Sequence, residues 1–512
     1  VFVMSESESK ATKLHNPLHV TIAVGVVAVA CAAMIHQEVA HKYVFGLLLA
    51  ITLGMLALEK INKAILVLLG SGLALLLAIW QGLLKKSDHG DSAHSLPVYI
   101  EMIDWGTIGI IIGSTIFVEL ISRGGLFTWI AVKILKVSRG DPFRLLICFS
   151  GLTVVFSAFL NNVTAMIIVG SLTIVSCRKL QLDAKPLLLA EGIFTNIGGL
   201  LTLISSIPNI IVGTAANISY ADFLVVSGPY CLIAFVATIY LVRFMFKLKP
   251  LDTDEKRTEA KAMVESFDEW ETVEDRKFFY LSALVLGAII LGFAFHSSIP
   301  ILNQMGLEVI ALIGATVMLV IYPTDVEGVL NEVEWTLVLF FVGLFTLLGV
   351  MEHAGVLTMI GDTLKAPLSN GPTSGPLAMM WSSAFFSGLT DNIPLSAVLA
   401  KVLGGFQENF QGGEGYKWFG EYGHLTWWAL IFGAGLGGNF TPIGSASTVV
   451  AISILKKQGY KITFMQYVKI GAVVVLVQLT LASAYLFAAD KAGIIPKMSN
   501  KDGSPAKESN GH

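Results

Sequence analysis

Long apolar runs separated by short polar segments fill most of the chain between Val20 and Phe487. A helix of about 20 apolar residues is long enough to cross a bilayer. Such runs lie at about 17–35, 43–58, 63–84 and 104–122, through a dense region at 143–246, then at 278–295, 307–322 and 335–352, and through a second dense region at 373–488. The pattern predicts an all-α polytopic membrane protein with about eleven spans.

The second half of the chain repeats the landmarks of the first half in the same order. Asp104-Trp105 matches Glu334-Trp335, and FSAFLNNVTA from Phe156 matches FSGLTDNIPL from Phe386, each pair 230 residues apart. IGGLLTLISS from Ile197 matches LGGNFTPIGS from Leu436, 239 residues later. We therefore expect two inverted repeats, each of five transmembrane helices plus a re-entrant hairpin, which is a common plan of secondary transporters.

This plan predicts the boundaries of the segments. They are a cytoplasmic tail (1–16), an extra first span (17–42), repeat 1 (43–246) with a hairpin (142–178) and a broken helix (186–216), a cytoplasmic linker (247–277), repeat 2 (278–488) with a hairpin (373–406) and a broken helix (424–456), and a C-terminal tail (489–512). Lys and Arg flank 123–186 and open the linker, so the N-terminus is expected in the cytoplasm and the C-terminus outside. The linker itself is expected to be a solvated connector.

Composition excludes several classes of protein. Hydrophobic residues make up 54% of the chain and charged residues 14%, whereas a soluble domain carries about 25% charged residues. The net charge of −3 and the lack of a basic arm give no reason to expect a nucleic-acid partner. The chain has no Gly-Lys dipeptide, no HExxH and no GxSxG, so an ATP-binding loop, a zinc-protease site and a hydrolase elbow are excluded. We expect no enzyme activity, no cofactor and no bound metal.

Polar clusters interrupt four of the apolar runs, two in each repeat. The clusters at 157–164 and 387–394 predict hairpin tips, and those at 196–209 and 437–448 predict broken helices. Polar groups at this depth are tolerated where they line a cavity or pack in protein, and hydroxyls and amides can also simply bind helices together. The candidate substrate-binding residues are Asn161, Asn162, Thr164, Thr202, Ser205, Ser206, Asn392, Asn439, Thr441 and Ser445.

Acidic residues within apolar runs are candidates for ion or proton coupling, because a charge near the bilayer centre costs at least about 2.5–3.5 kcal/mol. Asp391 in the second tip is the first candidate, and Asn161 occupies the matching place in the first tip. Glu191 is the second, although a place near the cytoplasmic end of its helix would leave its charge solvated. Ser157 and Ser387 complete the candidate coupling set.

Five segments resemble the ion-transporter superfamily that includes ArsB arsenite exporters, NhaD sodium–proton antiporters, the P protein and dicarboxylate/sodium symporters. They are SAFLNNVTAMII (157–168), AEGIFTNIGG (190–199), IPNIIVGTAANISYADF (207–223), DNIPLSAV (391–398) and GGNFTPIGSAST (437–448). Antiporter-like branches carry an Asp where this chain has Asn161, and a Gly-Asp-Pro-Pro-Asn run where it has 205–209. The second break is similar to the arsenite-exporter version.

The resemblance implies a secondary transporter in a bacterial inner membrane that exports arsenite or antimonite in exchange for protons by alternating access. Uncharged arsenous acid suits a pocket of hydroxyls and amides. Sodium–proton antiport and sodium-coupled symport of a dicarboxylate are the alternatives, and a membrane enzyme or a passive channel is a further class. The expected partners are the lipid bilayer, a small inorganic substrate and a coupling proton or sodium ion; a homodimer and a soluble ATPase partner stay open.

Overall fold

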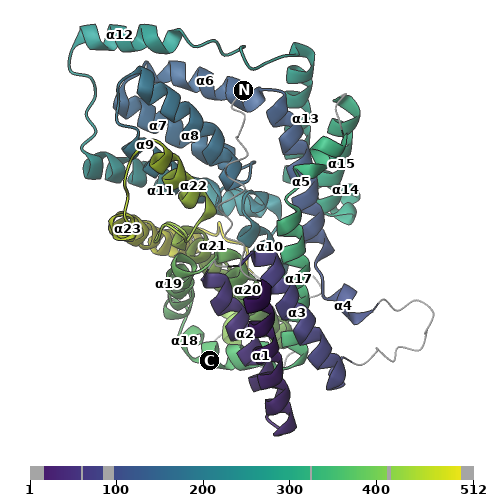
Figure 1. Ribbon diagram of the computed structural model, residues 1–512. Coiled ribbons are helices and arrows are strands. Elements are labelled where there is room, and N and C mark those ends of the chain that lie inside the picture. The colour runs from purple at the N-terminus through teal and green to yellow at the C-terminus, as the bar shows by residue number, and fades with distance from the viewer. Residues whose placement is uncertain (1–16, 59–60, 85–96, 323–325, 412–416, 498–512) are drawn as a thin grey trace. The chain divides into compact units, whose positions relative to one another are not determined.

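The computed structural model describes residues 17–58, 61–84, 97–322, 326–411 and 417–497 (Figure 1). These residues form helices joined by turns and short extended segments, without a β-strand among them, which confirms the all-α prediction. The expected tail at 1–16 and the last part of the C-terminal tail, 498–512, lie outside the described residues. The chain divides into two compact units, Val1–Asp104 with Trp335–Ile360, and Trp105–Glu334 with Gly361–His512.

The first unit is built around a pair of long apolar helices. Its helices are α1 (Pro17–His36), α2 (His41–Ala57), α3 (Lys63–Trp80), α4 (Val98–Glu101) and α17 (Trp335–His353). The side chain of Asn62 starts α3 by accepting a hydrogen bond from the backbone N of Ala64 at 3.0 Å. α17 packs along α3, and a Cβ at Gly343 would lie 3.1 Å from the backbone N of Leu68. The glycine therefore permits the close approach of the two helices.

The second unit contains the four segments in which the hairpins and the broken helices are predicted. Its helices before the linker are α5 (Trp105–Arg123), α6 (Leu126–Ser138), α7 (Pro142–Ser157), α8 (Asn162–Lys179), α9 (Lys185–Gly198), the 3₁₀ turn η2 (Leu203–Ser205), α10 (Ile207–Ala215) and α11 (Tyr220–Phe246). After the linker helix α12 (Asp254–Glu265) come α13 (Arg276–Phe295), α14 (Pro300–Met305), α15 (Leu307–Ile321), α16 (Val326–Asn331), most of α18 (Val356–Leu368), α19 (Ser374–Leu389), α20 (Asn392–Gln411), α21 (Lys417–Gly437), α22 (Ala446–Lys457) and α23 (Phe464–Lys491).

The helices of the second unit pack in a pattern that recurs in the two halves. α7 packs on α9 as α19 packs on α21, and α11 packs on α9 as α23 packs on α21. The short helix after each break crosses to the other half, since α10 packs on the hairpin helix α20 and α22 packs on the hairpin helix α8. These crossed contacts bring the two breaks together in one core.

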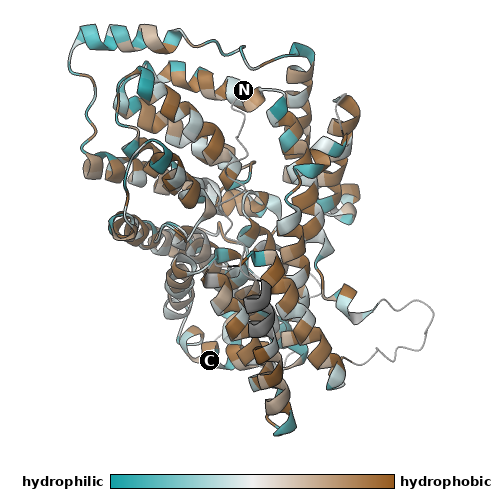
Figure 2. Cartoon of the chain, viewed as in Figure 1, coloured by the Kyte–Doolittle hydropathy of each residue, from teal (hydrophilic) through white to brown (hydrophobic). Residues whose placement is uncertain are grey.

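Six described helices are long and apolar enough to cross a membrane by length and composition, namely α3, α5, α11, α13, α17 and α23. Residues 25–36, 41–56, 142–157 and 307–321 form shorter apolar helices. Figure 2 shows hydrophobic residues along most helices and hydrophilic residues along α12. The count of about eleven spans and the inversion of the second repeat stay predictions.

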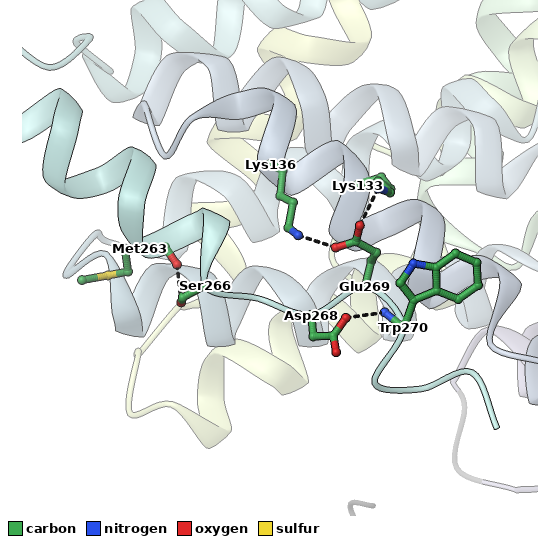
Figure 3. Close-up of polar contacts among 7 residues, drawn as sticks. All are labelled: Lys133, Lys136, Met263, Ser266, Asp268, Glu269 and Trp270. Carbon is green, nitrogen blue, oxygen red and sulfur yellow. Dashed lines mark hydrogen bonds and ion pairs between the residues drawn. The ribbon is translucent and has the colours of Figure 1, made fainter.

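The linker is largely exposed, as expected of a solvated connector, but residues on both sides of α12 also contact α6 and the N-cap of α7. The Glu269 carboxylate pairs with the ammonium groups of Lys133 and Lys136 on α6 (Figure 3). Leu251 donates its backbone N–H to Asp141 at 2.9 Å, and the Trp270 ring lies 5.7 Å from the Trp129 ring, centroid to centroid. The two lysines lower the pKa of Glu269 to about 2. Ion pairs and an aromatic contact with α6 therefore hold the linker against that helix.

Candidate functional site

The two hairpin tips are turned by the same capping interaction. Between α7 and α8, the Asn161 side chain accepts a hydrogen bond from the backbone N of Val163 at 2.9 Å. Between α19 and α20, Asp391 Oδ1 accepts one from the backbone N of Ile393 at 3.1 Å. Each side chain accepts a hydrogen bond from a backbone N–H that has no partner within the helix. The carboxylate of Asp391 also interacts favourably with the partial positive charge at the start of α20.

The first tip, which has no acidic residue of its own, contacts a carboxylate from another part of the chain. Asn161 Nδ2 donates to Glu334 Oε1 at 2.7 Å. Glu334 directly precedes α17 and is the landmark that matches Asp104 in the repeat. The sequence pattern does not mark Glu334 as a site residue, because only the folded chain brings it to a tip 173 residues away.

Hydroxyl groups of the two breaks hold the two tips in place. Thr202 Oγ1 donates to the carbonyl of Ala158 at 2.7 Å, and Thr441 Oγ1 donates to the carbonyl of Gly388 at 2.6 Å. The two interactions join equivalent positions in the two halves. Both threonines are about 2% exposed. These candidate substrate ligands therefore bind the protein's own backbone.

The first break is wrapped by its own side chains. Ser205 Oγ lies 2.7 Å from the Gly199 carbonyl and 2.6 Å from the Thr202 carbonyl, so it donates within that loop. Asn209 Nδ2 donates to the same two carbonyls, at 2.6 and 3.1 Å. Ser206 is half-buried and precedes α10 without a side-chain cap. The backbone carbonyls freed by the break are thereby satisfied.

Three oxygen atoms around this break are buried and have no hydrogen-bond partner: Ser157 Oγ, Asn162 Oδ1 and Asn209 Oδ1. All three side chains flank the Gly198-Gly199 pair. A Cβ at Gly198 would lie 2.8 Å from Ser157 Cβ, and one at Gly199 would lie 3.0 Å from Asn162 Nδ2 and 3.4 Å from its Oδ1. The glycines let the tip approach the break, and the result is a group of unsatisfied neutral oxygens.

A buried amide and hydroxyl network joins the two breaks. Asn196 Nδ2 donates to Asn439 Oδ1 at 2.7 Å, and Ser445 Oγ donates to Asn196 Oδ1 at 3.0 Å. Asn439 in turn donates to Gln478 Oε1 at 3.1 Å, which ties the network to α23. Thr195 donates to Ser447 at 2.6 Å. Asn439 and Ser445 are among the residues predicted from the sequence, whereas Asn196 and Gln478 are not, because their roles depend on the crossed packing.

The other candidates lie at the tips or in the helices around them. Ser387 donates to the Ala434 carbonyl at 2.6 Å, whereas Thr164 and Asn392 are half-buried in the first turns of α8 and α20. Glu191 is 1% exposed in α9, so its side chain is not solvated. Thr173 Oγ1 donates to Glu191 Oε1 at 2.5 Å, and Oε2 is buried without a partner.

No group of three or more His, Cys, Asp or Glu side chains within the described ranges could hold a metal ion. The four cysteines are free thiols. The site therefore consists of neutral oxygens and amides around two glycine-rich breaks, with carboxyl groups at Asp391, Glu334 and Glu191.

Comparisons with known proteins find relatives that match most of the chain. An uncharacterized transporter of Mycobacterium tuberculosis is 29% identical over 442 residues, which cover 85% of this chain and 95% of the relative. The human P protein is 28% identical over 530 residues, 88% of this chain and 61% of the P protein.

Two solved transporters share the fold at low sequence identity. MtrF of Neisseria gonorrhoeae, from a class of antimetabolite efflux pumps, aligns with a TM-score of 0.52 at 11% identity, covering 85% of this chain and 96% of MtrF. YdaH of Alcanivorax borkumensis aligns with a TM-score of 0.50 at 13% identity, covering 85% and 100%. The family profile described as citrate transporter, CitMHS, matches residues 53–419. The chain is a polytopic membrane transporter and belongs to the CitMHS citrate transporter family.

Proposed function

We propose that this protein is a secondary transporter that couples the movement of a small oxygen-rich substrate to a cation bound at the first break. The observation that carries the proposal is the group of three buried, unpartnered oxygens, Ser157 Oγ, Asn162 Oδ1 and Asn209 Oδ1. Hard cations prefer oxygen ligands. Because these three oxygens are neutral, they suit a monovalent cation better than a divalent one. Sodium is the cation that we assign to this group.

A carboxylate is the substrate that we place first. Four helices begin at the tips and breaks, at Asn162, Ile207, Asn392 and Ala446. Helix N-termini carry partial positive charge and unsatisfied N–H groups, so they attract an anion. The family is described by citrate transport, which names a substrate with this chemistry.

Arsenite or antimonite export is the second candidate. Thr202, Ser205, Asn439, Thr441 and Ser445 bind other groups of the protein. A substrate would therefore have to be held by the less buried Thr164 and Asn392, and by Asn161 once it leaves Glu334. These groups are neutral, which favours an uncharged acid such as arsenous acid. In that reaction Asp391 would exchange the proton.

The transport cycle that we propose is alternating access in an inverted repeat, with the N-terminus in the cytoplasm and the C-terminus outside. The crossed packing of α10 on α20 and α22 on α8 supports it, because each half completes the hairpin core of the other. In such repeats the substrate and ion sites lie at the interface of the two copies.

Thermal unfolding of the purified full chain in sodium, lithium or potassium chloride tests the cation site directly. A cation that binds only the folded protein stabilises it by RT ln(1 + [L]/Kd). We expect a sodium-dependent rise in Tm that is lost in Ser157→Ala and Asn162→Ala. Ser387→Ala is the matched control, because its hydroxyl already donates to Ala434. It should lower Tm in every salt and keep the sodium-dependent rise. An equal sodium effect in all variants would contradict the proposal.

A further inference from the structure

Thr173 on α8 and Glu191 on α9 form a buried polar pair that does not include the oxygens of the first break. Glu191 is 1% exposed, accepts a hydrogen bond from Thr173 on one carboxyl oxygen, and has its other oxygen buried without a partner. No described Lys, Arg or His forms an ion pair with it. A carboxylate in such a place would be an uncompensated buried charge, whereas a protonated carboxyl is neutral and costs far less.

The internal repeat supplies a built-in comparison for this pair. α20 and α21 pack as α8 and α9 do, and the positions that match Thr173 and Glu191 are Leu403 and Leu430. Both leucines are 0% exposed. The same packing place is therefore filled by two apolar side chains in the other half. Helix packing alone does not require a carboxyl and a hydroxyl here.

The surroundings of Glu191 belong to a contact between the two repeats. The neighbouring Gly192 faces α22, where a Cβ on the glycine would lie 3.1 Å from Ala451 Cβ and 3.6 Å from Thr448 Cα. The contact between α9 and α22 therefore includes the residue next to Glu191.

The titratable and charged groups near Glu191 can be named element by element. On α8, Cys177 is a buried free thiol, while Arg178 donates to Gln458 and Lys179 lies over the Phe267 ring. On α22 the charged residues, Lys456 and Lys457, stand in the last turn. On α7, Arg144 is exposed and Cys148 is a half-buried free thiol. On α11 and α21, Arg243 lies over the Phe143 ring of α7, and His424 pairs with Asp490. None of these charged groups acts as a counterion to Glu191.

We infer that Glu191 is a proton-binding site of the transporter, with Thr173 as its positioning residue. The proton forms an O–H bond on Oε2, the oxygen without a partner, while α8, α9 and α22 are packed. It leaves to water when the contact with α22 opens. The coupling proton is thereby bound away from the cation at the first break. This inference rests on the proposed function, because it assigns a second coupling ion to the same transport cycle.

Infrared difference spectroscopy of the full chain in lipid tests the site without a need for substrate. A protonated carboxyl has a carbonyl stretch that a carboxylate lacks. We expect the wild type to show such a band at neutral pH that disappears in strongly alkaline buffer. The band should be absent from Glu191→Gln. Asp183→Asn, which removes an exposed carboxylate just before α9, should keep it.

Two further variants separate a proton site from a purely structural pair. Thr173→Val should shift the carbonyl frequency, because the hydrogen bond to Oε1 is lost, and Thr173→Ser should restore it. The double variant Thr173→Leu/Glu191→Leu copies the pair of the second half and should fold, lack the band, and lose the pH dependence of transport. An undiminished band in Glu191→Gln would overturn the inference. A wild type without the band would overturn it as well. If the wild type shows the band and Glu191→Gln lacks it, the inference stands even if the sodium-dependent rise in Tm is not observed, so the two proposals fail separately.

Discussion

At the scale of single residues, the polar groups of the two breaks divide into those that hold the protein together and those that have no partner. Thr202, Thr441 and Ser445 are satisfied by backbone or side-chain groups of the chain itself. Ser157, Asn162 and Asn209 each keep an oxygen free. Composition could place both sets at the breaks, because polar residues at membrane depth stand out. It could not separate them, because their partners lie far away in the sequence.

The threonines that hold the tips give the first prediction. Thr202→Val and Thr441→Val remove a buried hydrogen bond and leave the carbonyl of Ala158 or Gly388 unsatisfied. We expect each to lower the free energy of unfolding by about 1–3 kcal/mol, measured by thermal unfolding of the purified chain. Thr480→Val is the control, because that exposed hydroxyl bonds only to Leu476 in its own helix. Unchanged stability with weakened substrate binding would instead make these threonines ligands.

At the scale of elements, the apolar pattern predicted the helices well, because burial in lipid or protein demands a continuous hydrogen-bonded helix. The hairpin predicted at 142–178 lies where α7 and α8 are found, and the break predicted within 186–216 lies between α9 and α10. The docking of the linker could not be predicted from the pattern. It depends on Lys133, Lys136 and Trp129 meeting Glu269 and Trp270, which is a tertiary arrangement.

The linker gives the second prediction. The pKa of Glu269 is lowered from 4.5 to about 2 by Lys133 and Lys136, so its ion pairs hold the linker fully above pH 4.5 and are lost as pH falls through about 2. We expect pepsin cleavage of the linker to increase over that pH range. Glu269→Gln should already show faster cleavage by trypsin at neutral pH.

A local charge pair is the control for the linker. Glu265→Gln removes a carboxylate that lies 3.6 Å from Lys261 within α12, so it should leave cleavage unchanged. Equal protection of the linker in Glu269→Gln and wild type would contradict the role of the α6 lysines.

At the scale of the whole molecule, close helix pairs occur at matching places in the two repeats. Gly113 and Gly343 lie 230 residues apart, and each faces the backbone of a helix from the other half. A Cβ at Gly113 would lie 2.7 Å from the backbone carbon of Ala311, and one at Gly343 would lie 3.1 Å from the backbone N of Leu68. The order of the repeats was readable from sequence landmarks, whereas this crossed pairing was not.

These glycines give the third prediction. Gly113→Ala should destabilise the protein by about 1–3 kcal/mol, because the α15 backbone must move to make room. Gly343→Ala should cost less, since its closest contact is longer. Gly287→Ala in α13 is the control, because a Cβ there meets nothing within 4 Å. It should be neutral or stabilising by up to about 1 kcal/mol through helix propensity. Thermal unfolding of the three variants checks the pairing. Equal losses of stability in all three would contradict it.

The central claim is that a cation held at the first break drives substrate movement, and uptake into proteoliposomes tests it most directly. Labelled citrate, succinate and arsenite are offered in turn, with and without an inward sodium gradient, to wild type, Asn162→Ala and Ser387→Ala. We predict accumulation of a carboxylate that requires the gradient, is lost in Asn162→Ala and persists in Ser387→Ala. Uptake that is unchanged by the sodium gradient and by Asn162→Ala would contradict the account. Arsenite movement driven by protons alone would contradict it as well.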